Sequence, residues 1–89
     1  MRMARLKDPL PDRIRAILRA AFPEDTIDVA PSGIRENIHV IVVSRALDKK
    51  TERQKQEYVW DLLERGGLTK GELARISMIL PVSIEELKR

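Results

Sequence analysis

The stretch Asn37–Ser44, NIHVIVVS, constrains the fold more than any other part of this 89-residue chain. Its β-branched, apolar residues predict a strand, in which side chains alternate between the two faces of a sheet. One face carries the apolar residues Ile38, Val40 and Val42. The other face carries His39, Ile41 and Val43. Because both faces are largely apolar, we expect a central strand, or a strand with a face that meets a partner.

The hydrophobic period predicts a helix on each side of this strand. Residues 14, 17, 18 and 21 are apolar at helical spacing, in a helix that Pro9 or Pro11 opens and Pro23 ends. A second helix is predicted from Thr51, which fits a capping box with Gln54, to the glycine pair at 66 and 67. Its apolar stripe consists of Tyr58, Val59, Leu62 and Leu63.

Shorter elements complete the predicted fold. TIDVA, residues 26–30, alternates as a strand, and the loop APSGIRE joins it to the central strand. TKGEL, residues 69–73, and the terminal SIEELKR each begin with a capping pair. ARISMIL alternates Ile76, Met78 and Leu80, which predicts a third strand that Pro81 ends. This order predicts an α+β fold, αββααβα, with the helices packed on one face of a mixed three-stranded sheet.

Length and composition restrict the class of protein. The chain has room for one domain, expected over residues 9–89 after a basic, flexible tail at residues 1–8. It has no cysteine, which excludes disulfides and cysteine metal sites. The longest apolar run, VIVV, is too short to span a bilayer, so we expect a cytoplasmic protein without membrane contact. No nucleophile or phosphate-binding motif is present, so an enzyme is not expected.

Two long stretches carry a resemblance to a known family. They are IHVIVVSRALDKKTERQKQEYVWDLL, residues 38–63, and ARISMILPVSIEEL, residues 74–87. Together with DRIRAILRAAF and TIDVA, they resemble the BolA-like family over residues 10–88. The resemblance implies the order αββααβα, which is related to the type II KH fold of nucleic-acid-binding proteins.

The resemblance also implies a function and a cofactor. BolA-like proteins are known as partners of monothiol glutaredoxins, with which they share a bridged two-iron cluster. Their ligands are a histidine at the start of the last strand and a histidine or cysteine in the loop between the first two strands. Here the first position falls on Ala74 or Arg75, neither of which can ligate a metal, and the loop has neither residue type. The resemblance thus implies a non-enzymatic adaptor or regulator without an intrinsic cofactor; an iron–sulfur cluster is either lost or held by a partner's ligands.

The predicted partner surface combines the third strand, the terminal helix and the only tryptophan. Its residues are Arg75, Trp60, Ala74 and Met78. Trp60 lies about 130° from the centre of the apolar stripe of its helix, where it either anchors a partner or folds onto a neighbouring element. Arg75 either holds a carboxylate or phosphate through two hydrogen bonds or pairs with a nearby acid of the same chain.

Nucleic-acid binding is the alternative function. The cations expected to contact phosphates are Arg45, Lys49, Lys50, Arg53, Lys55, Lys70 and Arg13. The segment GGLTKG, residues 66–71, occupies the position of the KH phosphate-binding loop but lacks its GxxG spacing. Aromatic residues make up only 3% of the chain, which argues against the reading of single strands by base stacking.

The only histidine, His39, is predicted to be a structural residue on a face of the sheet, with an ordinary hydrogen bond. A metal site needs several convergent ligands, and a general base needs a partner that orients its ring. No second histidine exists, and Glu36, three strand positions away, projects from the opposite face. We therefore expect neither a metal site nor a catalytic site at His39.

Overall fold

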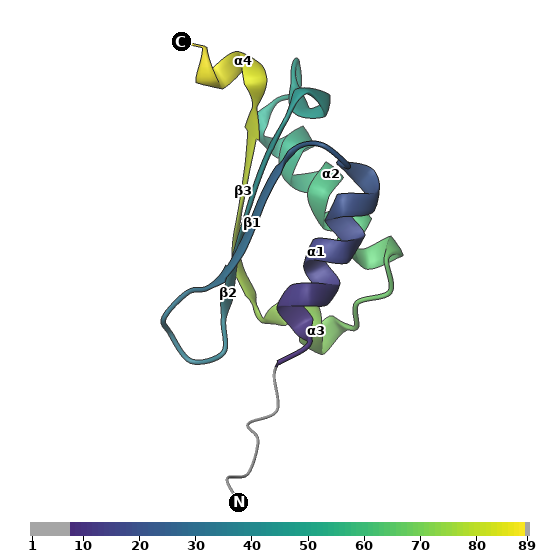
Figure 1. The fold of residues 1–89 in the computed structure, drawn as a ribbon, viewed down its shortest axis with the longest axis vertical. Coiled ribbons are helices and arrows are strands. Elements are labelled where there is room, and N and C mark those ends of the chain that lie inside the picture. The colour runs from purple at the N-terminus through teal and green to yellow at the C-terminus, as the bar shows by residue number, and fades with distance from the viewer. Residues whose placement is uncertain (1–7, 89) are drawn as a thin grey trace, which may run out of the picture.

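The computed structural model describes residues 8–88 and confirms the predicted α+β architecture (Figure 1). Its elements are α1 (Leu10–Ala21), β1 (Thr26–Pro31), β2 (Ile38–Ser44), the 3-10 turn η1 (Arg45–Leu47), α2 (Glu52–Arg65), α3 (Lys70–Ala74), β3 (Ile76–Ser83) and α4 (Ile84–Leu87). The strands form one mixed sheet in the order β1-β2-β3, antiparallel between β1 and β2 and parallel between β2 and β3. The predicted tail at residues 1–8 lies outside the described residues, except for Asp8.

Local signals position the helix ends as the sequence predicts. The Thr51 hydroxyl accepts a hydrogen bond from the Gln54 N–H at 3.1 Å, and the Gln54 side chain accepts one from the Thr51 N–H at 2.9 Å. The same reciprocal bonds begin α3 and α4, through the pairs Thr69–Glu72 and Ser83–Glu86. After α2, Gly67 adopts a φ of +100°, a conformation that favours glycine.

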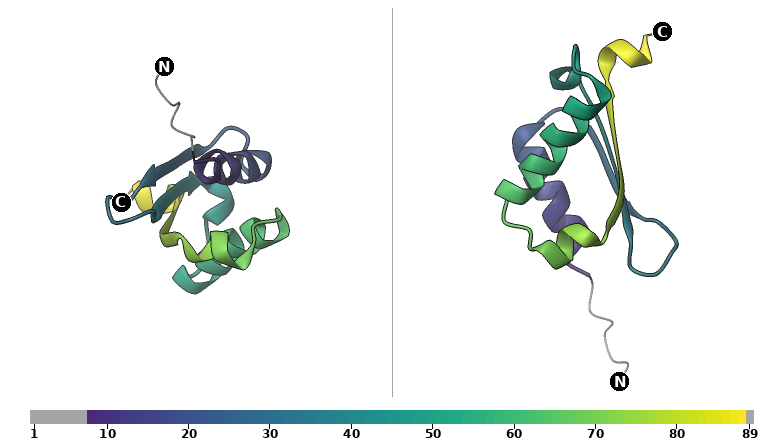
Figure 2. Two further views of the ribbon diagram at one scale, coloured as in Figure 1. Left: turned by 90° about the horizontal axis from the view of Figure 1, so that it is seen from below. Right: turned by 180° about the vertical axis from the view of Figure 1, so that it is seen from behind.

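The core lies between the sheet and the helices α1 and α2, which cover the same face (Figures 1 and 2). The buried apolar residues are Leu10, Ile14, Leu18, Phe22, Val29, Ile38, Val40, Val42, Leu47, Val59, Leu63, Leu68, Ile76 and Ile79. On β2 the burial alternates, with Ile38, Val40 and Val42 turned inward. The assignment of the two faces of this strand is therefore confirmed.

β3 departs from the predicted alternation. Ile76 pairs with Ile38, but Met78 pairs with His39, so Ser77 is an extra residue in a β-bulge. Beyond the bulge Ile79 and Pro81 are buried, whereas 39% of Met78 and 46% of Leu80 are exposed. The prediction that Ile76, Met78 and Leu80 share a face is therefore wrong. The predicted end at Pro81 is also wrong, because β3 is an edge strand, where proline is tolerated, and continues to Ser83.

Candidate functional site

The face of the sheet opposite α1 and α2 is a largely apolar surface, which we call the open face. The register places nine side chains on it: Thr26, Asp28, Ala30, His39, Ile41, Val43, Met78, Leu80 and Val82. None of the helices in residues 8–88 packs over this face, although the β1–β2 loop and α4 project beyond its two ends (Figures 1 and 2). Within the part of the chain that the structure describes, the open face is thus uncovered.

Arg75 lies where the β1–β2 loop meets the start of β3. Its guanidinium forms an ion pair with Asp8 and donates two hydrogen bonds to the carbonyl oxygen of Glu36, at 2.9 and 3.0 Å. The Ile38 N–H donates to the Arg75 carbonyl at 2.8 Å. The hydrogen bond from Arg75 lowers the pKa of the Asp8 carboxyl and raises the pKa of the guanidinium. Arg75 therefore pairs with an acid of its own chain, one of its two predicted roles.

A cavity of about 240 Å³ opens beside this ion pair. It is lined by Asp8, Pro11, Pro31, Arg35, Glu36, Asn37, Ile38 and Arg75. The β1–β2 loop and the start of β3 thus both line this cavity, and the exposed Ala74 precedes Arg75 there. No group of three His, Cys, Asp or Glu residues within 8–88 is placed to hold a metal ion. The charged side chains that line this cavity are Asp8, Arg35, Glu36 and Arg75.

Trp60 is half-buried rather than exposed. Its ring packs against the edge of the core, and its indole N–H donates to the Gln56 side-chain oxygen at 3.1 Å. The Gln56 amide donates in turn to the Ile79 carbonyl of β3 at 2.8 Å. The hydrogen bonds therefore link Trp60 to the edge of β3, as in the prediction that it folds onto a neighbouring element.

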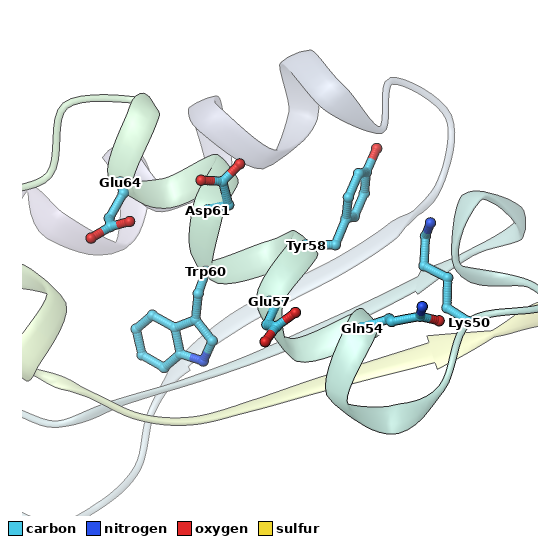
Figure 3. A pocket seen from close by; sticks show the side chains of 7 residues that line it. All are labelled: Lys50, Gln54, Glu57, Tyr58, Trp60, Asp61 and Glu64. Carbon is cyan, nitrogen blue, oxygen red and sulfur yellow. The ribbon is translucent and has the colours of Figure 1, made fainter.

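The solvent-facing side of α2 carries an open groove of about 520 Å³. Figure 3 shows its lining residues, Lys50, Gln54, Glu57, Tyr58, Trp60, Asp61 and Glu64, with Tyr58 and Trp60 on opposite sides of the helix. The Lys50 ammonium lies 5.0 Å from the centre of the Tyr58 ring, a cation–π contact. Three carboxylates among seven lining residues make this surface unfavourable for a phosphate backbone.

Lys55 belongs to the interior, not to a cationic surface. Its side chain is only 2% exposed, with the ammonium 2.7 Å from Glu52 and 2.5 Å from Glu86. Burial lowers the pKa of Lys55, but the hydrogen bonds to Glu52 and Glu86 and the negative charges of these carboxylates together outweigh burial and raise it. The bond from Lys55 and the Ser83 N–H hold the pKa of Glu86 at about 2. The prediction that Lys55 contacts phosphates is therefore wrong.

Other side chains that were predicted to contact phosphates form ion pairs with carboxylates of the same chain. Arg13 forms an ion pair with Glu72, and the Arg53 guanidinium lies 3.6 Å from Glu57. Arg45, Lys49 and Lys70 are exposed, although the Lys49 N–H donates to the Glu85 carboxylate of α4 at 3.0 Å. The fold thus interleaves the basic segment with carboxylates, whereas nucleic-acid binding requires a concentrated positive potential.

His39 lies half-buried on the open face, between Ala30 and Met78 in the register. No hydrogen bond of its ring is found among residues 8–88, and no metal-binding group includes it. Its place on a face of the sheet is as predicted, whereas the predicted hydrogen bond of its ring is not found in the described residues, and a purely structural role stays a prediction. The apolar residues Ile41 and Val43 predicted a second apolar face of the sheet. The outward position of Leu80 could not be predicted in the same way, because it depends on the bulge.

Comparisons with protein-family models, curated proteins and solved structures gave no match. The resemblance to the BolA-like family therefore stays a prediction, which rests on the two sequence stretches and the order of elements. None of the helices within residues 8–88 is long and apolar enough to cross a membrane.

Proposed function

We propose that this chain is a non-enzymatic docking module of the BolA-like kind, an adaptor or regulator of a monothiol glutaredoxin or another protein. One observation carries the proposal. The β1–β2 loop and the start of β3, which hold the ligands in that family, meet around Arg75 and enclose a cavity of about 240 Å³. In this protein the same place presents a fixed positive charge instead of a metal ligand.

A partner that docks around Arg75 would make charged hydrogen bonds and fill the cavity of about 240 Å³. A partner carboxylate would compete with Asp8 for the Arg75 guanidinium, since arginine binds carboxylates through paired hydrogen bonds. The exposed Ala74 and the first outward residue of β3, Met78, extend the surface in either direction. An iron–sulfur cluster shared with a glutaredoxin would need its ligands from the partner. We also propose that the protein is cytoplasmic.

The test is an amide-shift NMR titration of the labelled protein with a monothiol glutaredoxin, with and without its cluster. We expect shifts at Ala74, Arg75 and the loop residues 32–37. Arg75→Met should weaken binding at least about tenfold, because a charged hydrogen bond contributes about 1.5–3 kcal/mol and about 1.4 kcal/mol corresponds to a factor of ten. Arg65→Met is the matched control, because Arg65 pairs with Asp61 on the outer side of α2.

Two outcomes would contradict the proposal. The first is an absence of shifts, and the second is an equal loss of affinity in the Arg75 and Arg65 variants. A parallel titration with single-stranded DNA addresses the alternative function. Shifts at Arg45 and Lys49 that fade steeply with added salt would assign the chain to nucleic-acid binding.

A further inference from the structure

The exposed apolar residues gather on the open-face side of the molecule. Of the five large hydrophobic residues that are exposed within 8–88, Met78 and Leu80 lie on the open face itself. Two more, Ile34 at 65% and Leu87 at 60% exposure, belong to the β1–β2 loop and to α4. Both elements project beyond the ends of the open face (Figure 2). Exposed apolar residues gathered on one face are typical of a binding surface.

The dimensions of the open face fit one helix. Three strands at their usual spacing make it about 14 Å wide, and three outward residues per strand make it about 20 Å long. An α-helix is about 10 Å across, and about 13 residues cover 20 Å of length. The resulting area, about 300 Å², is well short of the ~800 Å² per partner of a stable protein dimer. The face alone would therefore hold a helix better than a second copy of this chain.

The charge on this face restricts the partner further. Asp28 lies on the open face opposite Ile41, and no ion pair or hydrogen bond of its carboxylate is found in residues 8–88. Glu24 and Asp25 precede β1 on the same edge of the sheet. A second copy stacked on the face would bring no lysine or arginine to Asp28, because none of the nine open-face residues is one, and an Asp28 carboxylate buried without a cation is costly. A partner with a cation at this edge avoids that cost.

We propose that the open face binds an amphipathic helix of a partner protein. The apolar stripe of this helix would lie over Ile41 and Leu80, and a lysine or arginine on its flank would pair with Asp28. The open face meets the docking surface around Arg75 only at Met78 and does not include the cavity beside Arg75, so the inference holds whether or not a glutaredoxin is the partner.

The experiment uses two synthetic 14-residue helical peptides with one leucine stripe, flanked by lysines in one peptide and by glutamates in the other. NMR titration of the labelled protein should give amide shifts at Ile41, Val43 and Leu80. The lysine peptide should bind at least tenfold more tightly. Because the chain carries a net charge of +3, non-specific attraction would favour the glutamate peptide. A preference for lysines therefore reports the edge at Asp28.

Two variants and one control test the assignment of residues. Leu80→Lys should abolish binding. Ala20→Lys, at an exposed position of α1 away from the open face, should leave binding unchanged. Both side chains face solvent, so neither lysine should disturb the fold. Asp28→Lys should reverse the preference between the peptides. Binding of neither peptide, or binding that ignores Leu80→Lys or Asp28→Lys, would overturn the proposal. Sedimentation equilibrium completes the test, because a dimer lost in Leu80→Lys would assign the face to a second copy instead.

Discussion

Gly66 controls how closely α1 and α2 approach. It caps α2 with an ordinary φ of −75°, so alanine can adopt its backbone conformation. A Cβ at this position, however, would lie 2.7, 2.7 and 2.8 Å from three carbons of Ile17 on α1. Carbon atoms in contact are normally about 3.5–4.0 Å apart. Gly66→Ala therefore forces the helices apart or the Ile17 side chain out of its place.

Two effects of opposite sign determine the stability of this variant. Replacing a helical glycine by alanine stabilises by up to about 1 kcal/mol, because the unfolded chain loses freedom. Overpacking a well-filled contact costs about 1–3 kcal/mol. We expect a net loss of about 1–2 kcal/mol, which for a domain of this size lowers the melting temperature by about 4–8 °C per kcal/mol.

Urea unfolding followed through the single tryptophan, Trp60, measures this loss. Ile17→Ala removes all three crowded carbons, so Gly66→Ala should be neutral or stabilising in that background. Gly67→Ala is the matched control. It meets no atom within 4 Å but requires a φ of +100°, so its cost of about 1–3 kcal/mol should be the same with or without Ile17. Additive effects of Gly66→Ala and Ile17→Ala would refute the steric argument.

The buried ammonium of Lys55 predicts acid sensitivity. The folded pKa of Glu86 is about 2, below its ordinary 4.5, so this carboxylate contributes stability above about pH 4.5 that disappears as the pH falls towards 2. Glu86→Gln should therefore flatten the dependence of the free energy of unfolding on pH, measured by urea unfolding between pH 2 and 6. Single-stranded DNA should bind only weakly, and the double change Lys49→Glu, Lys50→Glu should remove this binding without unfolding the protein; unchanged affinity would exclude the segment. Trp60→Ala should lower the free energy of unfolding by about 2 kcal/mol, since its ring is half-buried, and should raise the Kd for the partner. An unaltered Kd would remove Trp60 from the interface.

Features governed by neighbours along the chain could be predicted from the sequence. The capping pairs Thr51–Gln54 and Ser83–Glu86 began helices where they were expected, because the hydrogen bonds involved span only three residues. The faces of β2 followed from alternation alone. The bulge at Ser77 could not be predicted in this way, because it arises from the pairing of β3 with β2, nearly forty residues earlier.

The sequence contained a signal for the burial of Lys55, but its positive charge predicted an exposed position. It shares a helical row with Val59 and Leu63, at spacings of four residues, and both of these are buried. That row favours an inward position, whereas a basic side chain favours solvent. What decides between them is Glu86, 31 residues away, which meets the ammonium after α4 folds back beside η1. Only the tertiary structure supplies this partner.

The edges of the sheet support docking through its face. The Val29 carbonyl of β1 accepts a hydrogen bond from the Arg15 side chain at 2.8 Å, and the Ile79 carbonyl of β3 accepts one from Gln56. These side chains occupy acceptors that an added strand would need, so extension of the sheet by a partner strand is disfavoured. The bulge at Ser77 meanwhile turns Leu80 towards solvent on the open face. A partner of this sheet therefore gains most by packing across the strands, as a helix does.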